Sequence, residues 1–90
     1  MNIIIITKST KSQQDIKNLF TEFCRDEGFK LISVEPNDGI ENCYGVIIGV
    51  GRIRNPDGEK ADLVMEIVTL TTKNFVRNGT FDECYVEDFA

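Results

Sequence analysis

The chain has 90 residues, of which 41% are hydrophobic and 28% charged, a size and composition that suit one globular domain spanning residues 1–90. It has a net charge of −5 and no histidine, which excludes the common zinc patterns, and no apolar run long enough to cross a membrane. We therefore expect a cytoplasmic protein that needs no cofactor or metal and does not bind membranes.

The first half of the chain predicts a strand, a turn and a helix. Residues 2–7 include four successive isoleucines, which favour a central strand covered on both faces. A polar turn, residues 8–12, leads to a helix over 12–27, capped either by Ser12 with Asp15 or by Thr10 with Gln13. One apolar stripe at helical spacing runs along this helix, and Gly28 is placed to end it. The stripe consists of Ile16, Leu19, Phe20, Phe23 and Cys24.

The second half predicts more strands. Residues 29–34 are typical of a strand, and residues 46–50 and 63–68 are predicted to form a hairpin around a turn at 55–58, Asn-Pro-Asp-Gly. In this hairpin residues 46, 48 and 50 share an apolar face with 67, 65 and 63. The predicted core is Ile4, Ile6, Ile16, Phe20, Phe23, Leu31, Val46, Ile48, Val50, Leu63, Met65 and Ile67.

The opposite face of the predicted hairpin is rich in glycine. Gly45, Gly49 and Gly51 fall on it together with Ile47, and Val64 and Val68 lie across from them. Glycine inside a strand often marks a bulge or the close approach of another backbone. We favour internal packing or a bulge, and a homodimer through this Gly45/Gly49/Gly51 face is the other interpretation.

Two segments of the last third have an open interpretation. Residues 74–79 form either one helical turn or a loop. Residues 81–90 have four acidic side chains, no basic ones and three aromatic rings, and they form either an edge strand centred on residues 84–86 or a flexible tail.

The expected fold is α+β, in the order β-α-β-β-β, with one helix packed on a mixed or antiparallel sheet of four to five strands. A right-handed crossover places strand 2–7 parallel to strand 29–34 if both lie in one sheet. A ferredoxin-like arrangement would need a second full helix, which this interpretation does not contain.

The acidic charge is concentrated in one part of the chain. Residues 1–34 have five basic and four acidic side chains, whereas residues 35–90 have five basic and eleven acidic ones. This distribution argues against direct binding of nucleic acid and permits binding to a basic surface of another protein. The candidate partner-binding residues are those of the acidic-aromatic segment: Asp82, Glu83, Tyr85, Glu87, Asp88 and Phe89.

The turn at residues 8–12 is an alternative site. A strand that enters a helix N-terminus leaves backbone N–H groups free, and nearby lysines add positive charge, which is the chemistry of an anion site. The turn lacks the glycines of a phosphate loop, so an ordinary capped turn is the stronger interpretation. The candidate anion-binding residues are Lys8, Ser9, Lys11 and Ser12.

Little in the sequence favours catalysis. Cys24, Cys43 and Cys84 have no activating neighbour, and their odd number and wide spacing indicate reduced, structural thiols. We therefore predict no enzymatic activity and no catalytic or metal-binding residue. The leading hypothesis is a small acidic protein-binding module, by analogy an inhibitor of the viral, phage or mobile-element type that occupies a basic, nucleic-acid-handling surface. The alternative is a small-ligand or anion-binding domain that uses the turn at residues 8–12.

Overall fold

The computed structural model describes residues 1–37, 39–51 and 58–89. These residues form a four-stranded antiparallel sheet and two helices, which confirms the α+β class. The elements in chain order are β1 (Asn2–Lys8), α1 (Gln13–Glu27), β2 (Lys30–Pro36), β3 (Cys43–Gly49), α2 (Glu59–Arg77) and β4 (Glu83–Phe89).

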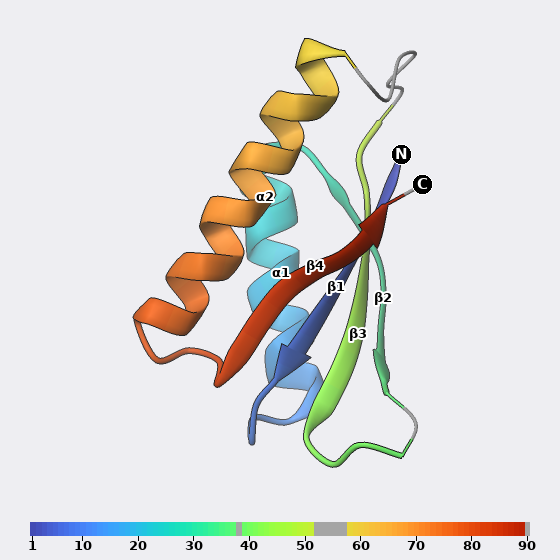
Figure 1. The fold of residues 1–90 in the computed structure, drawn as a ribbon. Helices are drawn as coiled ribbons and strands as arrows, with labels where there is room; N and C mark the ends of the chain where they lie inside the picture. Colours follow the sequence, from blue (N-terminus) through green and yellow to red (C-terminus); the bar gives the residue numbers. More distant parts are fainter. Residues whose placement is uncertain (38, 52–57, 90) are drawn as a thin grey trace.

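The strands lie in the order β2-β3-β1-β4, and every neighbouring pair is antiparallel. β1 and β2 therefore run parallel with β3 between them, as expected from a crossover through α1. This β-α-β-β-α-β order is the ferredoxin-like, or split βαβ, arrangement. Both helices lie on one face of the sheet, so no helix of the described residues covers the other face (Figure 1).

Local sequence accounts for α1. The Ser12 hydroxyl accepts a hydrogen bond from the Asp15 backbone N–H at 3.1 Å, so Ser12 is the N-cap. Gly28 ends the helix with a φ of 74°, a conformation that glycine adopts without strain. Between these caps Ile16, Phe20 and Cys24 are buried against the sheet.

The predicted strand at residues 63–68 is wrong, because this segment lies inside α2, and the predicted single helix becomes two. The buried residues of α2 follow a helical period: Ala61, Val64, Val68 and Thr72. The predicted pattern of burial is accordingly inverted. Val64 and Val68 are buried, whereas the side chain of Leu63 is 57% exposed. Residues 55–57 of the predicted turn lie outside the described residues.

The core lies between the sheet and the two helices. Ile3 and Ile5 of β1 are fully buried there, opposite Ile48 and Val46 of β3. The sequence-based core contained Ile4 and Ile6 instead of these two. Ile4 and Ile6 point to the helix-free face, because side chains alternate along a strand, although neighbours still bury Ile6. Residues predicted correctly include Ile16, Phe20, Val46, Ile48 and Val50.

Candidate partner-binding face

The face of the sheet away from the helices, which we name the open face, contains an apolar centre. The strand registers place Ile4 opposite Ile47, and Ile6 between Gly45 on one side and Tyr85 on the other. Antiparallel sheets that are solvated on one side normally have polar residues there. Here the two middle outward positions of β1, between Asn2 and Lys8, are the isoleucines Ile4 and Ile6, and Tyr85 is 48% exposed.

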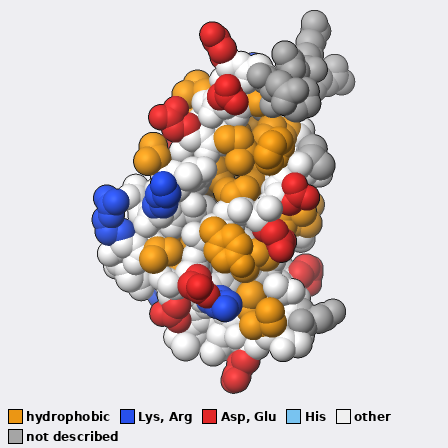
Figure 2. Space-filling view, viewed as in Figure 1, with side chains coloured by type: hydrophobic (Ala, Val, Ile, Leu, Met, Phe, Trp, Pro, Cys, Tyr) orange, Lys and Arg blue, Asp and Glu red, His pale blue; other side chains and the backbone are white. Residues whose placement is uncertain are grey.

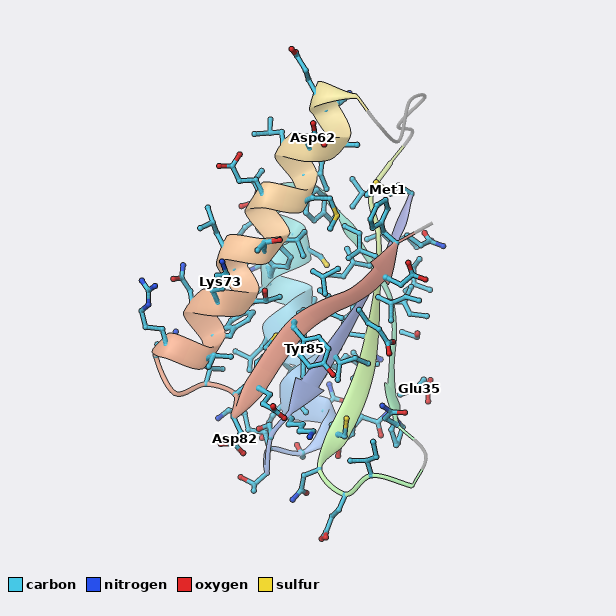
Figure 3. All side chains as sticks on the ribbon, viewed as in Figure 1. Met1, Glu35, Asp62, Lys73, Asp82 and Tyr85 are labelled. Atoms are coloured by element: carbon cyan, nitrogen blue, oxygen red, sulfur yellow. The ribbon has the colours of Figure 1, made fainter. Side chains whose placement is uncertain are left out.

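Charged side chains, most of them acidic, surround this apolar centre, and Lys30 of β2 lies on the same face opposite Gly49. Glu35 of β2 lies opposite Gly45, and Asp88 of β4 lies opposite Ile4. Glu83 lies opposite Lys8, and the two form an ion pair at 2.9 Å. Figure 2 shows acidic side chains beside exposed hydrophobic ones along β4, and Figure 3 shows Glu35 and Tyr85 on the two opposite edge strands.

The glycines of the open face have two different environments. A Cβ at Gly49 would lie 3.1 Å from Cδ1 of Ile32, so internal packing of β2 covers this position, next to the register shift between Leu31 and Ser33. A Cβ at Gly45 would meet no atom within 4 Å. Internal packing therefore explains Gly49, while Gly45 leaves a hollow in the sheet surface.

The six candidate residues of the C-terminal segment do not form a single cluster. Tyr85 and Asp88 lie on the open face, and Glu87 lines the hollow at Gly45. Asp82 precedes the strand, and its backbone N–H donates to the Lys8 carbonyl at 2.8 Å. Phe89 lies opposite Ile3, in the row that faces the helices, and is 46% exposed. The segment is thus an edge strand whose side chains divide between two faces of the molecule.

Sequence reasoning missed the contributions of Ile4, Ile6 and Glu35 to this face. The alternation along β1 leaves either the odd or the even isoleucines outward, and nothing in an unbroken apolar run distinguishes the two. Glu35 reaches the face only through the pairing of β2 with β3. That pairing includes an irregularity that the sequence does not reveal.

Several polar groups of the turn at residues 8–12 already form hydrogen bonds or ion pairs within the chain. Besides the bond at Ser12 already described, the Ser9 hydroxyl accepts from the Lys11 backbone N–H at 3.0 Å, and Ser9 is buried. The Lys8 ammonium is paired with Glu83, which raises the pKa of Lys8. Lys11 is exposed. These internal bonds are those of a capped turn, and anion binding there stays a prediction.

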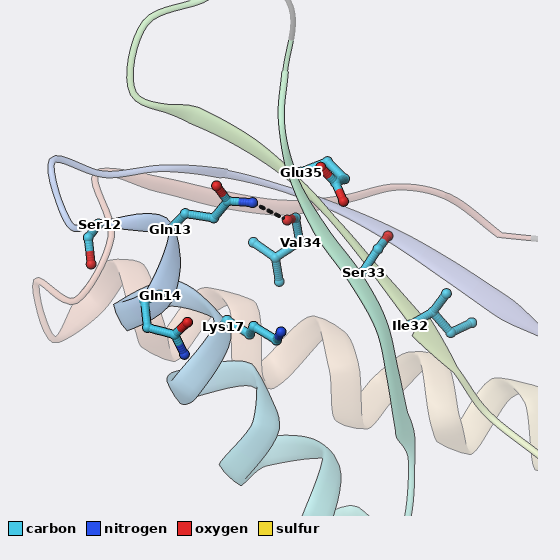
Figure 4. A pocket seen from close by; sticks show the side chains of 8 residues that line it. All are labelled: Ser12, Gln13, Gln14, Lys17, Ile32, Ser33, Val34 and Glu35. Carbon is cyan, nitrogen blue, oxygen red and sulfur yellow. Dashed lines mark hydrogen bonds between the residues drawn. The ribbon is translucent and has the colours of Figure 1, made fainter.

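A groove of about 520 Å³ lies between the start of α1 and the outer edge of β2 (Figure 4). The Gln13 side-chain amide crosses its upper part and donates to the Val34 carbonyl at 2.6 Å. This bond occupies a carbonyl that an edge strand would otherwise present to another chain. We interpret Gln13 as a residue that protects the β2 edge.

All three cysteines are buried and form no disulfide. Burial raises the pKa of the Cys24 thiol to about 11 and that of the Cys84 thiol to about 12. The thiolate form that nucleophilic chemistry requires is therefore disfavoured at neutral pH.

Because the Cys24 and Cys84 thiols have raised pKa values, we expect the protein to lose stability in alkaline solution. In the unfolded chain these two thiols lose their protons near pH 9, whereas in the folded chain they keep them until about pH 11 and 12. Above pH 9 the unfolded state therefore binds fewer protons, and the free energy of unfolding falls by up to about 1.4 kcal/mol per pH unit for each thiol. Urea unfolding at pH 7, 9 and 10 measures this fall. The double variant Cys24→Ala/Cys84→Ala should show a shallower fall, and an identical fall would contradict the prediction.

Within the described ranges, no group of three or more His, Cys, Asp or Glu side chains is placed to hold a metal ion. Neither helix, over the residues described, has the length and apolar character needed to span a bilayer. No protein-family model matches the chain, and searches of curated proteins and of solved structures find no match either. The open face is therefore the feature of the molecule from which function is inferred.

Proposed function

We propose that this protein is a small binding module that docks its open face on a basic surface of a partner protein. The observation that supports this most is the apolar centre of the open face, where half-buried Ile4 and Ile47 lie near the exposed Tyr85 and, among the described residues, no helix covers them. Contiguous apolar surface with a polar rim marks interaction sites in soluble proteins.

The rim of the open face supports a basic partner. Glu35, Glu87 and Asp88 come from the two edge strands and lie on either side of the apolar centre, whereas Glu83 is already paired with Lys8. Charge complementarity steers such a surface towards cationic groups and away from acidic ones. An inhibitor of the phage or mobile-element type, which covers a nucleic-acid-handling surface, is the form of this function that we favour by analogy.

Affinity capture from extract of the source cells, with paired variants, tests the proposal. The open-face variant Ile47→Thr/Tyr85→Thr removes apolar contacts and retains residues that favour strands. The control Leu63→Gln/Leu70→Gln removes exposed apolar residues of α2 and retains helix-forming side chains. We expect one or more basic proteins to be captured by the wild type and the control, and at least tenfold less by the open-face variant, because apolar anchors dominate interface energies.

Two results would contradict the proposal. Equal recovery with the open-face variant would place the contact elsewhere on the molecule. If only acidic or neutral proteins are captured, and added salt does not weaken their binding, the partner does not have the basic surface that we propose.

A further inference from the structure

The hollow at Gly45 has an apolar floor and carboxylates on two sides. Its volume is about 240 Å³. Ile4, Ile6 and Ile47 form the floor together with the bare backbone of Gly45, and Glu35 and Glu87 contribute the acidic groups. We refer to this feature as the Gly45 hollow.

Two irregularities of the sheet create it. Gly45 has no side chain where one would fill the space, since a Cβ there meets no atom within 4 Å. The register of β4 against β1 shifts between Ile4 and Ile5, which inserts Glu87 as an extra residue between Val86 and Asp88. A bulge of this kind re-aims a side chain, and Glu87 accordingly lines the hollow.

The positions of the two acidic residues suit a cation in the hollow. Glu35 is on β2 and Glu87 on β4, which are separated by three steps between neighbouring strands. At about 4.8 Å per step the two strands lie about 14 Å apart, and Glu87 is also displaced along β4, because Glu35 shares its row with Tyr85 through Gly45 and Ile6. Both glutamates line the same hollow, so a cationic group placed in it would have a carboxylate from each edge strand beside it.

The described side chains do not supply that cation. Among them, neither Glu35 nor Glu87 takes part in an ion pair, and Lys8 is bound to Glu83. A second copy of this chain would present the same open face, on which carboxylates outnumber lysines. Charge complementarity therefore favours a different, basic partner over a homodimer on this face.

We propose that the Gly45 hollow binds one arginine side chain of the partner, with its methylene groups on the isoleucine floor and its guanidinium between Glu35 and Glu87. Arginine fits better than lysine because its planar, forked guanidinium can donate to carboxylates on two sides while its stem covers apolar surface. This inference rests on the proposed function and specifies the contact that it makes.

The test uses N-acetyl-arginine-N-methylamide as the probe and amide chemical shifts of the full chain as the readout. We expect saturable shifts at Gly45, Ile47 and Glu87, with a Kd in the millimolar range that weakens severalfold in 0.5 M salt. The norleucine analogue, which has a similar stem and no charge, should bind at least tenfold more weakly.

Variants of the hollow give the decisive comparison. Gly45→Val should fill the space, leave the melting temperature unchanged or raised, and weaken probe binding more than tenfold. Gly45→Ala, whose single Cβ has free space, serves as the milder variant with a smaller loss. Glu35→Gln and Glu87→Gln should each weaken probe binding about three- to tenfold. Glu66→Gln, on the exposed side of α2, should not change the Kd of the probe.

Each outcome supports or overturns a named part of the proposal. If Gly45→Val binds the probe as the wild type does, or if Glu66→Gln acts like Glu87→Gln, the arginine site is overturned. If cell-extract capture needs Ile47 and Tyr85 but tolerates Gly45→Val, the binding function stands and the arginine contact fails. If the probe binds as expected but no protein is captured, the arginine site stands and the proposed function fails. Capture of a second copy of this chain would replace the heterologous partner with a homodimer.

Discussion

The variant Val68→Asp should leave most of the protein unfolded in the absence of denaturant. Val68 is fully buried in α2, on the side that packs against the sheet. A carboxylate placed there has no partner, and burying it costs several kcal/mol, enough to remove most of the about 5–15 kcal/mol that stabilises a typical domain. Circular dichroism during urea unfolding, compared with the wild type, measures the loss.

Leu70→Asp is the matched control, since it introduces the same charge two residues further along. Leu70 is 55% exposed, and we expect a change of at most about 0.5–1 kcal/mol in the free energy of unfolding. In a strand residues 68 and 70 would share a face, whereas in a helix they point to nearly opposite sides. Equal destabilisation by the two variants would therefore contradict the helical structure of this segment.

The error at residues 63–68 has a physical cause. The run Leu-Val-Met-Glu-Ile-Val is rich in β-branched residues and follows a turn-like Asn-Pro-Asp-Gly, so local propensity favours a strand. The longer window shows the helical period instead, because Ala61, Val64, Val68 and Thr72 recur at spacings of three and four. Packing of this stripe on the sheet outweighs the preferences of individual residues.

The elements with strong local signals were predictable. The four isoleucines indicate β1, and Ser12 and Gly28 delimit α1 through their capping chemistry. Period-two spacing also groups Gly45 with Gly49 on one face of a strand, although Val64 and Val68, predicted to lie across from them, are buried in α2. The positions of Glu35 and Glu87 on the open face were not predictable, because they depend on two register shifts in the pairing of the strands.

The aromatic cluster of Phe20, Phe75 and Phe81 should be a second major source of stability. Phe20 of α1 stacks on Phe81 with ring centroids 5.8 Å apart, and Phe75 of α2 packs edge-on against both. Phe20 is fully buried. Phe20→Ala should cost about 3–5 kcal/mol, because it removes a large ring and leaves a cavity between the two helices. Phe89→Ala, at an exposed ring, is the control and should cost much less.

A double-mutant cycle between Phe20 and Phe81 separates their direct contact from the general cost of a cavity. We expect a coupling energy of about 0.5–1.5 kcal/mol, typical of a buried aromatic pair. Phe81 lies two residues before β4, and its backbone N–H donates to the Phe75 carbonyl at 3.1 Å, so the cluster holds the start of the edge strand that contains Tyr85 and Glu87. The milder variant Phe20→Leu should therefore increase hydrogen exchange in β4 more than in β3. A uniform increase across the sheet would show that the cluster stabilises the whole fold without a particular effect on this strand.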